Sequence, residues 1–359
     1  KYRHLGTASN LEAFERLRIL PARNFPRLSI GREAARRLSP EGLRDAAGHE
    51  RDSCAGCTIG CDHRYGGARV EYESLWALGP LCGVDDPRRV IAAAAECDRL
   101  GLDTVSAGGT LAFAMECAER GLVRWPIAFG DDVTPWLRAI AGRDGVGDDM
   151  AEGTRSLAAR IGGGAAAFAC QVKGLELPGY DPRALPAMAL GMAVQSRGAD
   201  HNRSGAYQAD LRPGVDRQRP DFEAIPARVL EAEDHAALLD SLILCKFLRG
   251  AIPDPWTEGA ELLRMTAGLE VDAEDLRRAT GRIAALRHLF NLREGWTIAE
   301  DTLPERFFAD SLEGAAAVPR AELRAMIERI HALRGRGPDG RLDAAALARL
   351  DVARLVAQP

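Results

Sequence analysis

Three cysteines close together are the residues of this chain best suited to chemistry. Cys54, Cys57 and Cys61 lie within eight residues in a C-x2-C-x3-C pattern, with glycines at 56 and 60. The pattern supplies three soft thiolate ligands from one loop, and the glycines let the backbone wrap closely around a bound group. An iron–sulfur cluster usually takes its fourth thiolate from elsewhere in the chain. We therefore interpret this loop as the site of an iron–sulfur cluster.

Structural zinc and disulfides explain the same cysteines less well. Zinc ribbons normally pair two C-x2-C knuckles, and this sequence has no second knuckle. A disulfide framework is typical of small secreted domains, whereas this chain is large and carries helical patterns throughout. The order of the three spacings is also the reverse of the C-x3-C-x2-C of radical-SAM enzymes.

Size and composition indicate a protein of about two domains. The chain has 359 residues, of which 46% are hydrophobic and 28% charged. Its net charge of −5 argues against a nucleic-acid partner. No apolar run approaches the ~18 residues of a membrane span, and no signal peptide is visible. With eight cysteines, these features predict a cytoplasmic protein with no membrane partner.

Hydrophobic periodicity predicts a mostly α fold with few strands. Helical patterns cover 11–20, 32–38, 88–100, 107–120, 134–141, 150–161, 183–195, 227–248, 256–268, 274–290, 320–334 and 343–355. A polar loop is expected at 204–222. The glycine cluster at 162–164 and the residues that follow it suggest a domain boundary. We therefore predict two helical domains, 1–170 and 171–359.

Two hexapeptides echo each other, one in each half of the chain. Residues 98–103 read Asp-Arg-Leu-Gly-Leu-Asp and residues 240–245 read Asp-Ser-Leu-Ile-Leu-Cys. Each has an Asp, a Leu four positions later and an Asp or Cys five positions later. A carboxylate beside a helix end with free backbone groups could hold a polar heterocycle such as a pterin. For either hexapeptide alone, a capped helix end is the commoner explanation.

Taken together, these motifs resemble the aldehyde:ferredoxin oxidoreductase family of tungsten or molybdenum bis-pterin enzymes. The matching stretches follow the family's order along the whole chain, and include the three cysteines, the Glu-Tyr-Glu of 71–73, residues 97–106, 173–178, 181–184, 197–201, 240–245 and the Phe-Asn-Leu-Arg-Glu-Gly of 290–295. The resemblance implies two helical domains facing a shared cofactor cleft.

The resemblance also implies a role for each candidate residue. One [4Fe–4S] cluster would be ligated by four cysteines: Cys54, Cys57, Cys61 and Cys245. Each hexapeptide would bind one pterin of the cofactor, through Asp98, Leu102, Asp103, Asp240 and Leu244. Arg203 matches a basic residue against the pterin, and Glu73 and His201 match the catalytic positions on the substrate side of the metal.

Two departures from the family pattern change these expectations. Ile243 stands where the family often has glycine, which calls the tightness of the second turn into question. The family also begins with a β-rich domain, and this chain starts at Lys1 in the stretch that follows it. We therefore expect a fragment, a processed chain or one subunit of a split protein, inactive without a separate β-domain chain.

The expected reaction is oxidation of a small aldehyde by water to the carboxylic acid. Electrons would pass through the [4Fe–4S] cluster to ferredoxin or a similar acceptor, and Glu73 and His201 would move protons. Without the family context, His201 is more simply a satisfied histidine and Glu73 a partner for an arginine. Two alternatives stay open: another tungsten- or molybdenum-pterin reaction, such as reduction of an activated aromatic acid, or a non-catalytic fragment or electron-transfer subunit.

Overall fold

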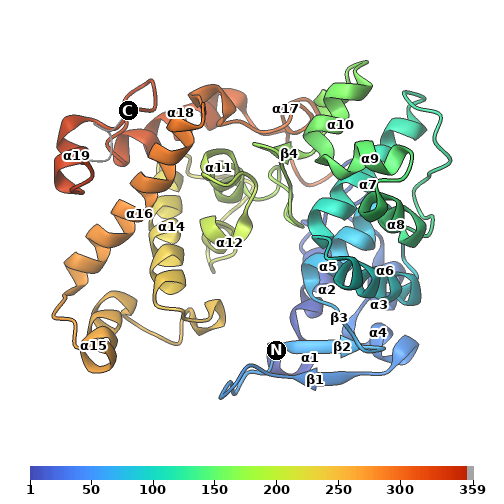
Figure 1. The fold of residues 1–359 in the computed structure, drawn as a ribbon, viewed down its shortest axis with the longest axis horizontal. Helices are drawn as coiled ribbons and strands as arrows, with labels where there is room; N and C mark the ends of the chain where they lie inside the picture. Colours follow the sequence, from blue (N-terminus) through green and yellow to red (C-terminus); the bar gives the residue numbers. More distant parts are fainter. Residues whose placement is uncertain (354–359) are drawn as a thin grey trace. The chain divides into compact units, whose positions relative to one another are not determined.

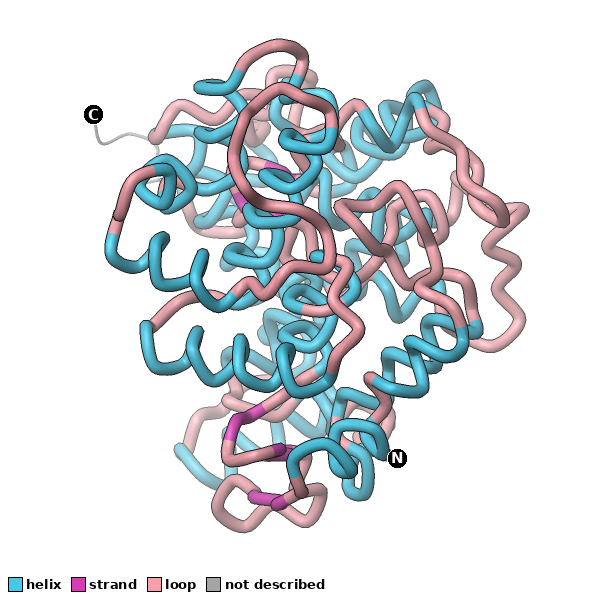
Figure 2. The backbone as a smooth tube through the Cα atoms, turned by 90° about the vertical axis from the view of Figure 1, so that its right-hand side faces the viewer, coloured by secondary structure: helices cyan, strands magenta, loops and turns pink. Residues whose placement is uncertain are grey.

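The computed structural model describes residues 1–353 and is built mostly from helices (Figure 2). Its few strands are short: β1 (Glu50–Asp52), β2 (Asp62–Tyr65) and β3 (Ala68–Arg69) form an antiparallel sheet, and β4 (Gln171–Val172) pairs with β5 (Leu175–Glu176). The prediction of a mostly α fold is confirmed.

The chain forms two compact units. The first contains Lys1–Leu185 and a returning segment, Leu303–Val318. The second contains Pro186–Thr302 and the described residues from Pro319 onward. The chain first crosses between the units after Leu185, whereas the predicted limit is 170/171. The predicted domain limits stay a prediction.

The first unit is organised around one helix that is buried on almost every side. Its helices are α1 (Tyr2–Leu5), α2 (Asn10–Arg16), α3 (Arg32–Arg37), α4 (Pro40–Ala47), α5 (Tyr72–Leu78), α6 (Pro87–Leu100), α7 (Thr104–Glu119), α8 (Thr134–Gly142), α9 (Val146–Ala151), α10 (Gly153–Ile161) and α17 (Arg306–Ala309). Helix α7 is rich in alanine and other small or apolar residues and packs on α5 and α10 (Figure 1). A helix this apolar all round is expected to lie in a core.

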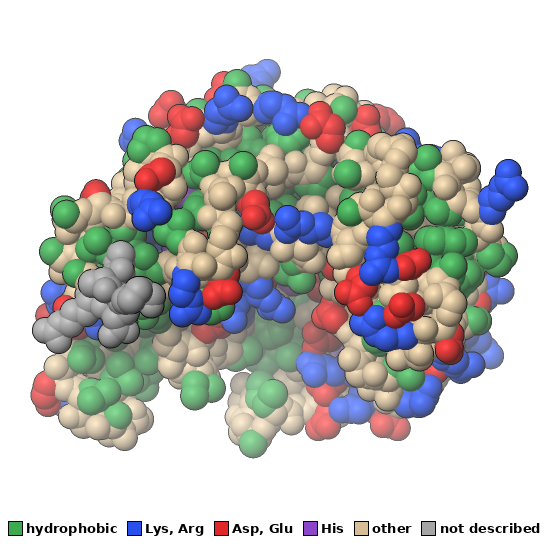
Figure 3. Space-filling model, turned by 45° about the horizontal axis from the view of Figure 1, so that its top comes forward, with side chains coloured by type: hydrophobic (Ala, Val, Ile, Leu, Met, Phe, Trp, Pro, Cys, Tyr) green, Lys and Arg blue, Asp and Glu red, His purple; other side chains and the backbone are tan. Residues whose placement is uncertain are grey.

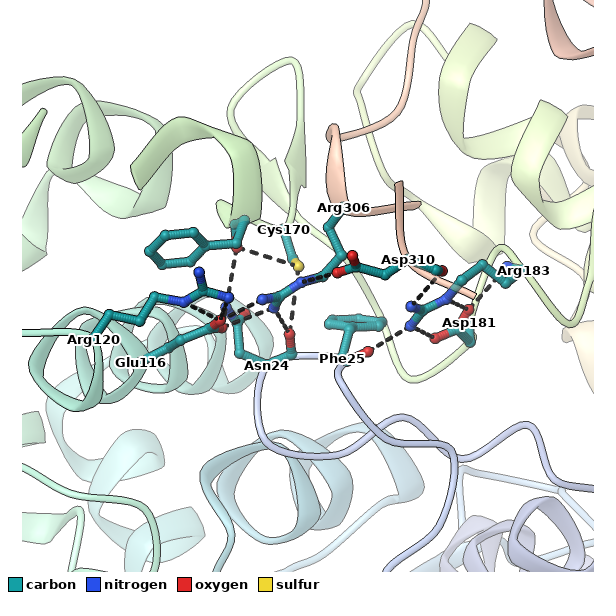
Figure 4. Close-up of polar contacts among 10 residues, drawn as sticks. Asn24, Phe25, Glu116, Arg120, Cys170, Asp181, Arg183, Arg306 and Asp310 are labelled. Carbon is teal, nitrogen blue, oxygen red and sulfur yellow. Dashed lines mark hydrogen bonds and ion pairs between the residues drawn. The ribbon is translucent and has the colours of Figure 1, made fainter. Parts of the chain in front are cut away.

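A buried ion pair holds the returning segment in the first unit (Figure 4). Arg306, on α17, donates from Nη1 to Oε2 of Glu116 on α7 at 2.8 Å, and both side chains are almost fully buried. The Asn24 side chain donates to the same carboxylate oxygen at 2.6 Å. Nearby, buried Arg183 donates to the carbonyl of Asp310 at 3.3 Å. Because these hydrogen bonds engage most of the polar atoms, the charges can lie inside the unit, although Nε of Arg306 has no hydrogen-bond partner among residues 1–353.

The second unit is a bundle of helices. They are α11 (Pro186–Val194), α12 (His201–Ser204), α13 (Tyr207–Asp210), α14 (Ile225–Ser241), α15 (Pro255–Ala267), α16 (Ala273–Arg293), α18 (Arg320–Leu333) and α19 (Ala344–Arg349). Helix α14 packs on α11, α16 and α18 (Figure 1). The buried carboxylate of Asp210 accepts from the Ala187 and Met188 N–H groups, each at 2.9 Å, and so satisfies two donors in the first turn of α11.

The structure corrects several predicted helix limits. The single helix expected at 150–161 is two helices, because the break at Gly153 lets the Thr154 N–H donate to buried Glu176 at 2.7 Å. The helix expected at 227–248 ends at Ser241. The expected loop at 204–222 contains α13, and the part of the last predicted helix beyond residue 353 lies outside the described residues.

The surface carries charges of both signs. On the face drawn in Figure 3, Lys and Arg side chains lie among Asp and Glu side chains, with hydrophobic ones between them. Within residues 1–353, no helix is both long and apolar enough to cross a bilayer.

Candidate cofactor and cluster site

The three clustered cysteines lie in the loop between β1 and β2. These strands pair antiparallel up to Asp52 and Asp62, so the loop closes on a fixed base. Cys54 is exposed, and Cys57 and Cys61 are half-buried. Within residues 1–353, no group of three or more His, Cys, Asp or Glu side chains is arranged to hold a single metal ion.

The backbone of this loop favours a thiolate at Cys57. The N–H groups of Gly60 and Ile59 donate toward its sulfur and hold the pKa of the thiol below its usual range. Gly56 and Gly60 have φ of 70° and 56°, a left-handed conformation that other residues adopt only with strain. The turn therefore needs these glycines, and its donors suit a thiolate that ligates a cluster.

Cys245, the proposed fourth ligand, belongs to the second unit. It is exposed and precedes a short 3₁₀ helix, Lys246–Leu248, where its sulfur accepts from the Phe247 N–H at 3.4 Å. Its sulfur is thus available on the surface of its own unit. Its approach to the other three cysteines stays a prediction.

The first hexapeptide is a chain reversal between two helices. Helix α6 ends at Leu100, and Gly101 takes a left-handed conformation with φ of 71°. The Leu102 N–H then donates to the Cys97 carbonyl at 2.9 Å, which is the long bond of a Schellman motif. Asp103 follows as the N-cap of α7 and accepts from the Ser106 N–H at 2.7 Å.

The second hexapeptide repeats this geometry in the other unit. Helix α14 ends at Ser241, and Ile243 takes the left-handed position with φ of 56°. The Leu244 N–H donates to the Leu239 carbonyl at 2.8 Å, and Cys245 follows as the N-cap of the next turn. The capped helix end considered for each hexapeptide is therefore present in both, and the two are the same motif.

The proposed pterin ligands are available at these reversals. Asp98 and Asp103 are exposed in the first, and Asp240 is exposed in the second. Leu102 and Leu244 are both half-buried. Each reversal thus presents a carboxylate beside a helix end, as a polar heterocycle requires.

Glu73 begins the helix that lies beside the first reversal. It is in the first turn of α5, and its neighbour Ser74 bonds Thr104 at the start of α7 at 3.0 Å. Burial raises the pKa of Glu73 to about 8, and the charges of Glu71 and Asp103 add to the rise. The carboxyl group therefore keeps its proton at neutral pH.

A turn distant in sequence fixes the position of Glu73. The Gly179 N–H donates to Oε2 of Glu73 at 3.0 Å, which lowers its pKa in part, and the Gly179 carbonyl accepts from the Tyr72 hydroxyl at 2.6 Å. A Cβ at residue 179 would lie 2.6 Å from that hydroxyl, so only glycine fits. The sequence does not reveal this contact: Pro178 and Gly179 indicate a turn, but nothing indicates its partner 106 residues away.

His201 is the first residue of α12, in the second unit. Asp200 caps this helix by accepting from the Asn202 and Arg203 N–H groups at 2.8 and 3.1 Å. Burial lowers the pKa of His201 to about 4, and the positive charges of Lys246 and Arg249 also lower it. The negative charge of Asp200 opposes the shift. The imidazole is therefore neutral at physiological pH.

Lys246 connects this helix to the second reversal and was also missed in the sequence. Its ammonium donates to the Asn202 carbonyl at 2.6 Å and lies 3.6 Å from the carboxylate of Asp240. Arg203 lies on the same short helix, 3.7 Å from Asp200. The only signal for Lys246 was its place next to Cys245.

Within each unit, then, some of the predicted residues lie close together. Glu73 interacts with Asp103 of the first reversal, and Lys246 joins the helix of His201 to Asp240. That these two sets of residues bind one cofactor together stays a prediction. The donors present suit the expected groups: thiols in a backbone nest for a cluster, and exposed carboxylates at helix ends for pterins.

The mostly helical fold and its two matching chain reversals agree with a known family model. The family model for aldehyde ferredoxin oxidoreductase, domains 2 and 3, matches residues 1–352. The chain therefore belongs to the aldehyde ferredoxin oxidoreductase family.

Curated relatives of this chain are tungsten-containing aldehyde ferredoxin oxidoreductases. That of Pyrococcus furiosus is 35% identical over 320 residues, covering 84% of this chain and 52% of the relative. That of Pyrococcus abyssi is 32% identical over 359 residues, covering 94% of this chain and 58% of the relative. The chain thus spans little more than half the length of these relatives.

A solved structure shares the fold. The active-site complex BamBC of benzoyl coenzyme A reductase matches with a TM-score of 0.76 and 19% identity, over 98% of this chain and 61% of the matched one. At this identity the likeness shows the fold alone.

Proposed function

We propose that this chain is the cofactor-binding part of a tungsten- or molybdenum-dependent aldehyde oxidoreductase. An aldehyde and water become a carboxylic acid, two protons and two electrons. The observation that carries the proposal is the repeated reversal at 98–103 and 240–245, in a chain that the family model matches from residue 1 to 352.

In this proposal the cluster and the pterins have separate ligands. Cys54, Cys57, Cys61 and Cys245 hold the [4Fe–4S] cluster. The pterins are bound at the two reversals by Asp98, Leu102, Asp103, Asp240 and Leu244, with Arg203 beside them. When bound at these residues, the metal centre would supply Lewis-acid and two-electron redox chemistry, and the cluster would supply one-electron transfer to ferredoxin.

Glu73 and His201 supply complementary proton chemistry in this proposal. Glu73, with a pKa of about 8, is protonated at neutral pH and can donate to the aldehyde oxygen. His201, with a pKa of about 4, is unprotonated and can accept a proton from the attacking water. The Gly179 N–H keeps the Glu73 carboxyl in place.

Activity in this proposal requires a β-rich part that corresponds to the rest of the relatives' length. Two helical units cover part of a large cofactor, and a low dielectric around the reacting atoms requires that water be excluded from all sides. The protein works in the cytoplasm, with ferredoxin as its acceptor.

Metal content and turnover together test the proposal. Two proteins are produced anaerobically: the chain alone, and the chain joined to the β-rich part of a relative. For each, the iron, tungsten and molybdenum contents are measured, and dye reduction is assayed with a panel of aldehydes. We expect four irons per chain, tungsten or molybdenum in the joined protein, and turnover there only. A joined protein that holds tungsten or molybdenum but oxidises no aldehyde would refute the reaction.

Reduction of an activated aromatic acid is the second candidate. The likeness to the benzoyl coenzyme A reductase complex favours it, through the fold alone. To distinguish this reaction from aldehyde oxidation, the same preparation is assayed with an aromatic acyl thioester and a strong reductant. Iron without tungsten or molybdenum would instead favour an electron-transfer subunit.

A further inference from the structure

The second unit contains a small cavity whose walls are unusually basic. It has a volume of about 40 Å³ and lies among α14, α16, α18 and the end of α11. Its charged lining consists of four arginines and two carboxylates, namely Arg203, Arg287, Arg334, Arg336, Glu233 and Asp234. The lining therefore carries an excess of positive charge.

Both carboxylates of the cavity are already engaged by one arginine. Arg334 donates to Asp234 at 2.7 Å and to Glu233 at 3.1 Å. Glu233 also accepts from the side chain of Gln195 at 3.3 Å. This cluster leaves little negative charge for the other arginines of the cavity.

Arg287 and Arg336 lack a carboxylate partner among residues 1–353. The Nε atom of Arg336 is buried and has no hydrogen-bond partner, and its Nη1 lies 3.4 Å from Nδ1 of His331. Arg287, on α16, makes no hydrogen bond or ion pair in the described part of the chain. A buried guanidinium donor without an acceptor is costly, because it has lost its water.

The surroundings of these two arginines disfavour their charge. Burial lowers the pKa of Arg336 to about 10, and Arg334 contributes to the shift. Burial also lowers the pKa of Arg287, the charge of Arg203 adds to the effect, and the carboxylates of Asp240, Glu233 and Asp200 oppose it in part. An anion in the cavity would relieve the desolvation of both arginines and the repulsion that Arg203 and Arg334 exert on them.

We propose that this cavity binds one small inorganic oxyanion, such as sulfate or phosphate, through Arg287 and Arg336, which both line it. Guanidinium groups present parallel donors that match the oxygens of such an ion. The volume is that of a few water molecules, which suits an ion of this size. Neither Arg287 nor Arg336 is among the predicted pterin or cluster residues, although Arg203, which also lines the cavity, is one of the proposed pterin residues.

Calorimetric titration of the 359-residue chain with sodium sulfate and sodium phosphate, at constant ionic strength set by chloride, tests this site. We expect one saturable site per chain. Arg287→Gln should weaken binding at least about tenfold, the effect of losing one charge-assisted contact. Arg336→Lys should do the same, since lysine cannot form the guanidinium fork. If Arg336→Lys does not fold, Arg287→Gln alone tests the site, because Arg287 makes no ion pair within residues 1–353 whose loss would destabilise the chain.

Arg329→Gln is the matched control, because Arg329 is exposed on α18 and its loss changes the net charge equally. Retained affinity in this variant supports the site. Equal weakening in all three variants, or no saturable heat, overturns it. A phosphate monoester that binds as tightly as inorganic phosphate would show that the site takes the end of a larger molecule, which also overturns the proposal of a free ion.

Discussion

Gly101 and Ile243 occupy the same left-handed position in two chain reversals of one type, with φ of 71° and 56°. Glycine adopts this conformation freely, whereas a β-branched residue does so only with strain. Ile243 is also 93% exposed, so its side chain gains nothing from burial. The second reversal is therefore strained at a position where the first is relaxed.

Ile243→Gly should stabilise the chain. Relief of the left-handed strain stabilises the folded chain by roughly 1–2 kcal/mol. The greater freedom of glycine in the unfolded chain offsets up to about 1 kcal/mol of this gain. We expect a net gain of up to about 1 kcal/mol in the free energy of unfolding by urea. The reciprocal change Gly101→Ile should lower it, and a loss of stability in Ile243→Gly would contradict the account.

Asp98→Ala and Asp240→Ala should reduce metal loading far more than stability. Both carboxylates are exposed, so each change should alter the free energy of unfolding by no more than about 0.5 kcal/mol. Tungsten and molybdenum are measured in the joined protein for each variant. Asp45→Ala, at an exposed position on α4, is the control, and normal loading in both reversal variants would remove the pterin assignment.

Cys245→Ser should yield a protein whose cluster is lost or converted on oxidation. The proposed cluster would then retain three thiolates from the 54–61 loop and lack its fourth. Iron content and electron paramagnetic resonance before and after exposure to air measure the change. Cys117→Ser alters a buried cysteine outside the set and should leave the iron content unchanged. An unaltered cluster in Cys245→Ser would exclude this ligand.

Glu73→Gln should change how stability depends on pH. The folded chain keeps the Glu73 proton up to about pH 8, whereas the unfolded chain loses it near 4.5. Stability therefore falls as pH rises between these values, by at most about 1.4 kcal/mol per unit from this group. The variant should resemble the parent at pH 4 and be more stable at pH 8, as measured by urea unfolding. Parallel pH profiles would show that the pKa is not raised.

Arg306→Met should be strongly destabilising, by about 3–5 kcal/mol, because it leaves the charge of Glu116 buried without its main partner. Arg99→Met removes an exposed arginine that pairs with Glu96 and should cost about 1 kcal/mol or less. Urea unfolding of both variants gives the comparison. If adding Glu116→Gln to Arg306→Met recovers no stability, the buried charge is not the cause.

The sequence predicted features that depend on neighbours along the chain and missed those that depend on distant ones. The end of α6 and the start of the buried helix α7 follow from Gly101 and Asp103, which are local signals, although α7 begins at Thr104 and not at the predicted residue 107. Ile243 carries no glycine signal, yet it takes the same conformation because the reversal is set by its hydrogen bonds. The contact of Gly179 with Glu73 had no signal at all, since it forms through tertiary packing.

The break between α9 and α10 illustrates the same limit. Periodicity alone favoured one helix, but the Thr154 N–H bonds a buried carboxylate from another part of the unit. Similarly, the ion pair that anchors the returning segment joins residues 190 positions apart. Such pairs have no periodicity and cannot be found by reading one sequence.

The return of residues 303–318 to the first unit affects how the chain matures on the ribosome. Glu116 emerges long before its partner Arg306, and at typical synthesis rates of 5–20 residues per second the delay is roughly 10–40 s. During that interval Asn24 and Arg120 are the side chains that can contact Glu116. The first unit therefore completes its core only after most of the second unit has been made, although it begins first.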